Sequence, residues 1–475
     1  MAESVSRMKR GAVVQWVVDH PVRSGVIAGW YQQACSAFAA LVAVPLVIRL
    51  LGKTESGLWF SFIGTLAVLQ LTDFGLSFVM ARQIAYSLRE KEGRPPAGPD
   101  FIETRGGWGG VSDVFACSLR VFRWLILAGV FALVLLYQVI LPQGRLLAGA
   151  GSGTAVAWYL LGGAVVLSLQ NKPYQALLDG LAMTYVTRFL AGTSLFISGF
   201  GALGALMLGG RLPEMASVVA LTSVAHCLAL RWAVRRVAGA RLERVARLPG
   251  GLMRRFLHVA APMGVLNLSA FCVTSVQVPL LGFLLGAEVV PGFYLAQRIG
   301  QMLNQAVMQL AYPQLPLFTR ELAAGAKAGA LQRMSRTIAW VVSVGLAANA
   351  VFVLASPSFV EHWVGPDRYV STSVLVLMGV DYTIMAAGAA MAQFVLASGR
   401  NPFLWTTLAN GALNLLVGPP LALSLGVIGL PIAGLASGLC TNYWFAPFQS
   451  LGLRRRLMQP PSPEVGNASG VSPSS

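Results

Sequence analysis

Long apolar runs separated by short polar stretches cover most of the chain. A helix needs about 20 apolar residues to cross the hydrocarbon layer of a bilayer. Twelve runs meet that length, at about 24–51, 56–80, 119–141, 155–172, 186–209, 214–234, 258–286, 291–318, 335–356, 370–398, 402–424 and 426–449. The pattern predicts an all-α polytopic membrane protein with about twelve transmembrane helices.

The first run has a partner later in the chain. The segment VPLVIRLLGKTESGLW at 44–59 shares its frame with VPLLGFLLGAEVVPGFY at 278–294. In both, a proline lies seven residues before the glycine of a Leu-Leu-Gly turn, and an aromatic residue follows. Pro45 and Pro279 occupy equivalent positions, and proline bends a helix by removing one backbone hydrogen bond. We predict a helix bend at each, which would help to open and close one mouth of a cavity; a static kink is the alternative.

Three glycines repeat in the same way. Gly180, Gly192 and Gly199 have the same separations as Gly399, Gly411 and Gly418. The matches relate helix 1 to helix 7 and helix 5 to helix 11, so each pair lies six helices apart. An even offset preserves orientation, which predicts two parallel six-helix repeats around a central cavity.

This repeat suggests a division into lobes. We expect four parts: an N-terminal lobe at 1–234, a basic cytoplasmic linker at 235–257, a C-terminal lobe at 258–457 and a disordered cytoplasmic tail at 458–475. The tail is rich in proline, serine and glycine, a composition that is typical of disorder.

Charge is scarce and unevenly placed. The chain is 56% hydrophobic and 11% charged, against about 25% charged residues in soluble domains. With the N-terminus in the cytoplasm, most basic residues fall on the cytoplasmic side, and the exceptions are Arg49, Lys53, Arg145, Arg211, Arg368 and the intramembrane Arg298. This is the positive-inside pattern. The net charge of +17 is therefore a topology signal, not a nucleic-acid footprint, and both termini are expected to be cytoplasmic.

The sequence offers no catalytic or metal site. The five cysteines and four histidines are scattered without ligand or disulfide spacing. The run GAGSG at 149–153 lacks the spacing of a phosphate-binding loop. We therefore expect no enzymatic activity, no metal and no cofactor, with coupling to H⁺ or Na⁺ left open.

Several short motifs, taken in order, resemble the Wzx-type oligosaccharide flippases of the multidrug/oligosaccharidyl-lipid/polysaccharide exporter superfamily. The motifs are Pro45…Arg49-Leu-Leu-Gly…Gly57-Leu-Trp, Asp73-Phe-Gly-Leu, Arg82-Gln-Ile-Ala, Phe293-Tyr-Leu-Ala-Gln-Arg-Ile, Tyr312-Pro-Gln-Leu-Pro and Asn410-Gly-Ala-Leu-Asn-Leu…Gly426-Val-Ile-Gly. The resemblance covers about 25–450. It implies transfer of undecaprenyl-pyrophosphate-linked oligosaccharide across the bacterial inner membrane for O-antigen, lipopolysaccharide, capsule or exopolysaccharide assembly, with polymerase machinery as a further partner.

Arg298 is the sharpest candidate for substrate binding. Ionisable residues inside a membrane are costly and often functional, and Arg298 falls seven residues into helix 8. A guanidinium binds a pyrophosphate with paired hydrogen bonds. Gln301 and Asn304 lie near the same helical face and would contact sugars. The alternative is that Arg298 extends to the interface or pairs with an acid.

Three further groups are weaker candidates. Asp381, near the middle of helix 10, is expected to bind a coupling ion or to pair with Arg298. Asp73 and Arg82 are expected to hold the cytoplasmic mouth closed, as a gate. Arg49 and Lys53 mark the periplasmic end of helix 1 and would hold a phosphate on exit, unless they simply extend into the interface.

Other functions remain open at this stage. A cation-coupled multidrug exporter on the same fold would need acidic residues in the cavity to bind cationic drugs, whereas this chain has few acidic residues within its apolar runs. A lipid II flippase usually has helices beyond twelve. A membrane-embedded glycosyltransferase or polymerase would need larger loops. A non-transporting scaffold of a polysaccharide assembly machine is disfavoured only weakly.

Overall fold

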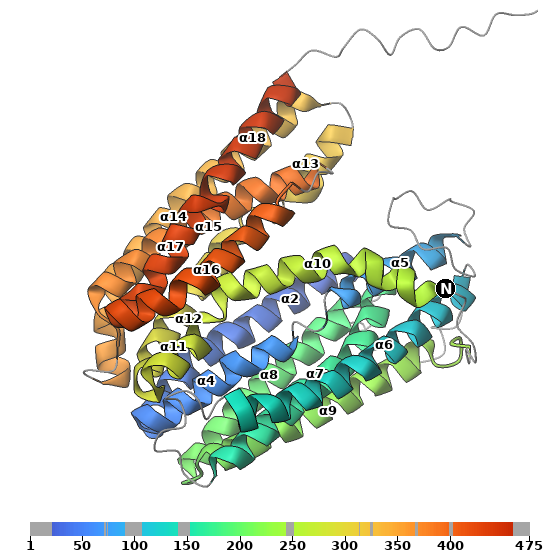
Figure 1. Ribbon diagram of the computed structural model, residues 1–475. Coiled ribbons are helices and arrows are strands. Elements are labelled where there is room, and N and C mark those ends of the chain that lie inside the picture. Colours follow the sequence, from blue (N-terminus) through green and yellow to red (C-terminus); the bar gives the residue numbers. More distant parts are fainter. Residues whose placement is uncertain are drawn as a thin grey trace, which may run out of the picture.

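A computed structural model describes residues 21–70, 73, 75–90, 107–140, 153–243, 251–312, 314–323, 326–365, 369–398 and 402–458. These residues are almost entirely helical, with no strand among them. Figure 1 shows two helical bundles that meet at one end and diverge toward the other. Residues 459–475 of the predicted tail and 244–250 in the middle of the predicted linker lie outside the described residues.

The first bundle contains the helices up to residue 238. They are α2 (Pro21–Phe38), η1 (Ala39–Ala43), α3 (Val44–Leu50), α4 (Lys53–Gln70), α5 (Leu76–Glu90), α6 (Gly107–Leu135), η3 (Leu136–Ile140), α7 (Thr154–Gly180), α8 (Thr184–Met207) and α9 (Leu212–Ala238). Of these, α6 to α9 are each long and apolar enough to cross a membrane as single helices. The first two predicted spans are instead divided, into α2–η1–α3 and α4–α5.

The second bundle follows from residue 252. Its helices are α10 (Leu252–Thr274), α11 (Gln277–Leu285), η5 (Ala287–Val289), α12 (Val290–Met308), α13 (Gln314–Ala323), α14 (Lys327–Val364), α15 (Thr372–Ala397), α16 (Leu404–Leu425), η6 (Gly426–Ile428), α17 (Gly429–Cys440) and α18 (Asn442–Met458). Three of these helices, α10, α14 and α15, are long and apolar enough to cross a membrane, and so is the stretch Leu404–Met458. The pairs α10–α11, α12–α13 and α17–α18 complete the spans, and the protein is a multi-pass all-α membrane protein.

Both repeat copies interrupt their leading helix just before the proline. In the first copy η1 is a π-helical turn, and the N–H of Val44 donates to the carbonyl of Ala39. In the second, α10 ends at Thr274 and the N–H of Val276 donates to Phe271 O at 3.0 Å. Both are bonds to the fifth preceding residue. Proline has no N–H and its ring collides with the preceding turn, so a wide turn relieves both problems.

The glycines that end these segments both have positive φ angles. Gly52 has φ +65° between α3 and α4, and Gly286 has φ +98° between α11 and η5. Residues with a side chain rarely adopt such angles, so glycine is required at both turns. The repeated Leu-Leu-Gly therefore marks a sharp reversal of the chain at the end of each leading helix.

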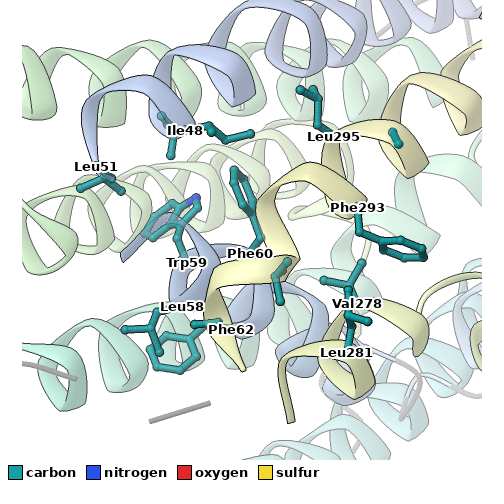
Figure 2. Packing of buried hydrophobic residues seen from close by; sticks show 14 of the residues in the cluster. Ile48, Leu51, Leu58, Trp59, Phe60, Phe62, Val278, Leu281, Phe293 and Leu295 are labelled. Carbon is teal, nitrogen blue, oxygen red and sulfur yellow. The ribbon is translucent and has the colours of Figure 1, made fainter. Parts of the chain in front are cut away.

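The bundles share one hydrophobic core at the end of the molecule that contains these turns, called the Gly52 end below. A single cluster combines buried residues of both bundles, among them Phe60, Phe62, Val278 and Phe293, as Figure 2 shows. The ring of Phe60 stacks on Tyr294 with centroids 4.3 Å apart. A methyl group added at Gly57 would overlap the carbonyl oxygen of Ala287. The two backbones therefore meet directly at the Gly52 end.

At the opposite end the core is divided. One cluster belongs to the first bundle, with Leu76, Val111 and Leu230, and is joined by Phe256 from the first half of α10. Another, around Phe318 and Phe394, belongs to the second bundle alone. Away from the Gly52 end, the first half of α10 joins a cluster of the first bundle, and the remaining clusters lie within the second bundle, which fits the diverging shape in Figure 1.

Candidate functional site

Arg298 bridges the two bundles. It is the ninth residue of α12, about 12 Å along the helix from its start. Its Nη2 donates a hydrogen bond of 2.9 Å to Ser36 Oγ on α2. Within the part of the chain that the structure describes, no carboxylate lies within 4.0 Å of this guanidinium, since the ion pairs there involve other arginines and lysines. A positive charge between the bundles thus has a neutral partner among the described residues.

A second polar contact lies further along the same helices. Gln33 Nε2 donates to Gln305 Oε1 at 3.0 Å. Positions 298 and 305 are seven apart on α12, and positions 33 and 36 are three apart on α2. Residues at these spacings lie near one face of a helix, so the two contacts share one face of each helix. The seam between α2 and α12 is therefore polar away from the Gly52 end.

Gln301 and Asn304 do not join Arg298. Gln301 Nε2 points to Thr274 O, 3.4 Å away at the end of α10 in the second bundle. The Oδ1 of Asn304 is buried without a hydrogen-bond partner among the described residues. A buried amide oxygen without a partner costs free energy. The structure thus separates the three residues: Arg298 contacts the first bundle, whereas Gln301 faces the break between α10 and α11.

That break opens a polar cavity inside the second bundle. The cavity is small, with a volume of about 20 Å³, and Asp381 and Tyr382 of α15 line it together with Gln277, Gln297 and Gln301. Gln297 Nε2 donates to Thr274 O at 2.9 Å and to Gln277 Oε1 at 3.2 Å. Side chains therefore satisfy part of the backbone that the break exposes.

Asp381 has a partner that is not Arg298. The hydroxyl of Tyr443 on α18 donates to Asp381 Oδ1. Its other oxygen lies 3.8 Å from the position that a methyl group on Gly434 would take. No ion pair joins it to Arg298 among the described residues, so that alternative is not realised in this conformation. Asp381 thus lines the cavity, and Gly434 and Gln277 lie beside its carboxylate.

Asp73 contacts residues of its own bundle. It accepts hydrogen bonds from Ser77 N at 3.1 Å and from Ser77 Oγ at 2.9 Å, and Lys172 Nζ on α7 lies 3.9 Å from its Oδ2. Arg82, half-buried on α5, also belongs to this bundle. These contacts tie the start of α5 to α7, and a gating role for Asp73 and Arg82 stays a prediction.

Arg49 and Lys53 lie away from the other candidates. Both are exposed at the Gly52 end, Arg49 in the last turn of α3 and Lys53 at the start of α4. Arg49 is thirteen residues beyond Ser36 on the same span, which corresponds to about 20 Å. Phosphate binding by these two residues stays a prediction.

The two prolines lie in α3 and α11. Pro45 is buried. Pro279 lies at the contact between bundles, because a methyl group on Gly64 of α4 would come within 2.9 Å of Pro279 Cδ. A gating movement at either proline stays a prediction.

Comparisons with known proteins show the fold. No family model matches the chain, and no curated protein matches it. A solved structure described as the inward-facing conformation of a multidrug resistance MATE family transporter of the MOP superfamily has TM-score 0.65 and 13% identity, covering 90% of this chain and 99% of that one. The lipid II flippase MurJ, in an inward closed conformation, has TM-score 0.63 and 11% identity over 91% of this chain and 90% of its own.

A third structure, a mutant of the Vibrio cholerae MATE transporter VcmN, has TM-score 0.58 and 16% identity over 92% of this chain and 98% of that one. MOP abbreviates the multidrug/oligosaccharidyl-lipid/polysaccharide exporter superfamily that the sequence motifs resemble. At these identities the likeness concerns the fold, which hosts both drug transporters and a lipid flippase. The chain therefore has the two-repeat membrane fold of MOP transporters.

Proposed function

We propose that the protein is a flippase that moves an undecaprenyl-pyrophosphate-linked oligosaccharide across the bacterial inner membrane, for O-antigen, capsule or exopolysaccharide assembly. One observation carries the proposal: Arg298 lies between the bundles and, among the described residues, its guanidinium has the neutral hydroxyl of Ser36 as its partner. A charge in such a place is retained at a cost. A substrate diphosphate would supply a countercharge through paired hydrogen bonds.

The shape supports transport by alternating access. The bundles share a core at the Gly52 end and separate at the other. The chain overlays better on an inward-facing MATE transporter, at TM-score 0.65, than on an outward-facing one, at 0.53. We infer that the diverging end faces the cytoplasm, as do both termini, and that the headgroup enters there while the lipid tail stays in the bilayer.

The proposal is tested in the host by deleting the gene and extracting its lipids. We expect undecaprenyl-pyrophosphate-linked oligosaccharide to accumulate, and the wild type to relieve the accumulation. Arg298→Ala should fail, because loss of a hydrogen bond to a charged group costs about 1.5–3 kcal/mol, or roughly tenfold to hundredfold in binding. Arg298→Lys should restore part of the function, since it keeps the charge but not the fork geometry.

A matched control uses an arginine that does not lie between the bundles. Arg211 is exposed, with Nη1 3.6 Å from Glu55 Oε1 at the Gly52 end, and Arg211→Ala should restore function fully. Rescue by Arg298→Ala at equal protein level would remove the site assignment and would also fit a scaffold of the polymerase machinery. No accumulation after deletion would contradict the flippase itself.

A cation-coupled multidrug exporter is the second candidate, and the polar cavity around Asp381 favours it. A carboxylate beside three glutamines suits a cation. If drug export is the function, deletion sensitises the host to cationic drugs and Asp381→Asn fails to protect it. Under the flippase proposal Asp381 instead binds a coupling H⁺ or Na⁺, and Asp381→Asn slows lipid transport without changing drug sensitivity.

A further inference from the structure

Two arginines from different bundles lie along one face of α2. Arg298 of α12 donates its hydrogen bond to Ser36 Oγ. Seven residues earlier, a methyl group placed on Gly29 would lie 2.5 Å from Arg188 Nη1, so the guanidinium of Arg188, on α8, lies over α2 at that point. Positions 29 and 36 project from nearly the same side of the helix. Arg188 therefore lies on the side of α2 that faces the second bundle.

The missing side chain at position 29 makes this placement of Arg188 possible. The two helices are in close contact here, since a methyl group on Gly25 would lie 2.9 Å from Thr184 Oγ1. Positions 25 and 29, like positions 184 and 188, are one turn apart, so the contact continues from one turn to the next. Any Cβ at position 29 would occupy the space of Arg188 Nη1. The guanidinium thus depends on a glycine for its position.

The charge of Arg188 is not balanced at close range. Its side chain is exposed, and across the described ranges no carboxylate lies within 4.0 Å of it. Asp179 on α7 interacts with Arg188 at longer range, but this carboxylate already accepts a hydrogen bond of 2.7 Å from Thr187 Oγ1. Arg188 therefore resembles Arg298 in presenting a guanidinium without a close acidic partner among the described residues.

The spacing of the two arginines fits one diphosphate. Seven residues of α2 correspond to about 10 Å along the helix axis. A charge-assisted hydrogen bond from each guanidinium takes up about 2.8 Å, which leaves roughly 5 Å between the two accepting oxygens. Oxygens on two linked phosphorus atoms can span that distance, whereas the oxygens of one phosphate share a single phosphorus and are too close together. A monophosphate therefore reaches one of the two arginines at a time.

A pair of amides lies between the two arginines. Gln33, on the turn of α2 between positions 29 and 36, donates from Nε2 to Gln305 Oε1 of α12 at 3.0 Å. The amide nitrogen of Gln305 is a further donor at the same level of the seam. The side chains from Arg188 to Arg298 thus offer donors along the whole distance, as a ligand with several anionic oxygens requires.

We propose that Arg188 and Arg298 bind one lipid-linked diphosphate between them, one guanidinium on each phosphate, and that Gly29 gives Arg188 its position. This inference rests on the proposed flippase function and adds to it a means of selecting lipids that carry a diphosphate. Membrane phospholipids with a single phosphate cannot engage both arginines at once. Because Arg188 belongs to the first bundle and Arg298 to the second, the bound diphosphate also joins the two bundles.

The test compares the binding of undecaprenyl diphosphate and undecaprenyl monophosphate to the detergent-solubilised protein by native mass spectrometry. Arg188→Ala should weaken diphosphate binding about tenfold to hundredfold, because hydrogen bonds to a charged group are lost. It should weaken monophosphate binding far less, since Arg298 remains. Arg235→Ala is the matched control, at an exposed arginine in the last turn of α9, and should bind both lipids as the wild type does.

A second variant keeps both charges and moves one of them. Gly29→Ala should displace the Arg188 guanidinium and weaken diphosphate binding by a smaller factor than Arg188→Ala, with monophosphate binding unchanged. Gly204→Ala is its control, because a methyl group there meets no described atom within 4 Å. Unfolding midpoints equal to that of the wild type would exclude misfolding as the cause. Unchanged diphosphate binding in Gly29→Ala would contradict the role of Gly29.

Inorganic pyrophosphate tests whether the lipid-linked headgroup is the ligand. We expect it to bind more weakly than undecaprenyl diphosphate, because it has no tail to bury, and to lose a similar factor in Arg188→Ala. Pyrophosphate binding as tight as that of the lipid would mean that the two arginines take free diphosphate, and would overturn the assignment to a lipid headgroup.

The outcomes separate the two proposals. If undecaprenyl diphosphate fails to bind the wild type, the flippase function fails together with the two-arginine site. If Arg298→Ala weakens diphosphate binding while Arg188→Ala does not, the flippase stands and the two-arginine site is wrong. Equal losses of diphosphate and monophosphate binding in Arg188→Ala would also overturn the site, since Arg188 would then act only as a general positive charge.

Discussion

The α2–α8 seam of the first bundle and the α10–α16 seam of the second occupy equivalent places in the repeat but are filled differently. In both, a repeated glycine brings the helices together: a methyl group at Gly192 would lie 2.9 Å from the Tyr31 ring, and one at Gly411 would lie 3.0 Å from Ser269 Cα. The helix contacts are thus duplicated. What differs is the side chains around them.

The difference is clearest next to the helix interruptions. In the second seam Asn414 Nδ2 donates to Cys272 O at 2.9 Å and to Val273 O at 3.3 Å. The equivalent position in the first seam is Leu195, which lines a small apolar hollow with Cys35 and Phe38. The interruption of the second seam is bonded by an amide and borders a polar cavity, whereas the side chains beside the first are apolar. Duplicated helices can therefore carry an asymmetric site.

The largest effect on stability is expected where the two seams are alike, at their repeated glycines. Gly192→Ala and Gly411→Ala should each lower the free energy of unfolding by about 1–3 kcal/mol, because each added methyl group overpacks a helix contact. Thermal unfolding of the detergent-solubilised protein measures this. Gly163→Ala, at a position on α7 with no described atom within 4 Å, is the control and should be neutral. A large loss in only one seam would break the equivalence.

The next largest effect on stability is expected where the two seams differ, at Asn414 and Leu195. Asn414→Leu gives the second seam the residue of the first and leaves two carbonyls without their donor, so we expect a loss of about 2 kcal/mol. Leu195→Asn, the reverse change, should cost less because Leu195 donates no hydrogen bond that the change would remove. Unfolding midpoints of the two variants compare them directly. Equal costs would mean that the amide does not close the interruption.

The smallest effect concerns the polar cavity. Tyr443→Phe removes the hydroxyl that donates to Asp381, and a loss of about 1 kcal/mol in stability is expected. If Asp381 binds a coupling ion, the same change should also alter how transport responds to an H⁺ or Na⁺ gradient. Tyr312→Phe, at a residue 45% exposed, should do neither. An unchanged ion response in Tyr443→Phe would leave Asp381 with a structural role.

The sequence predicted what depends on spacing within the chain. The spans, the repeat offset and the turn glycines Gly52 and Gly286 follow from local pattern, because backbone geometry demands glycine there. The contacts between residues far apart in the chain did not follow from the sequence. Ser36 and Arg298 are 262 residues apart, and a serine in an apolar helix carries no signal of which neighbour it faces.

Helical spacing also gave a wrong prediction for α12, where residues near one helix face contact different neighbouring elements. Gln301 lies near the face of Arg298, yet it turns to Thr274 in the second bundle, because α12 lies between the bundles. Tyr443 was missed as the partner of Asp381 for a similar reason, being 62 residues away on another span.

The most direct test of the account is lipid transfer by the purified protein in liposomes. A fluorescent undecaprenyl-pyrophosphate-linked sugar is placed in both leaflets, and its accessibility to a membrane-impermeant quencher is followed with time. We predict transfer by the wild type and by Arg211→Ala, and a loss of roughly tenfold to hundredfold for Arg298→Ala at the same unfolding midpoint. Equal transfer by the wild type and Arg298→Ala would contradict the central claim.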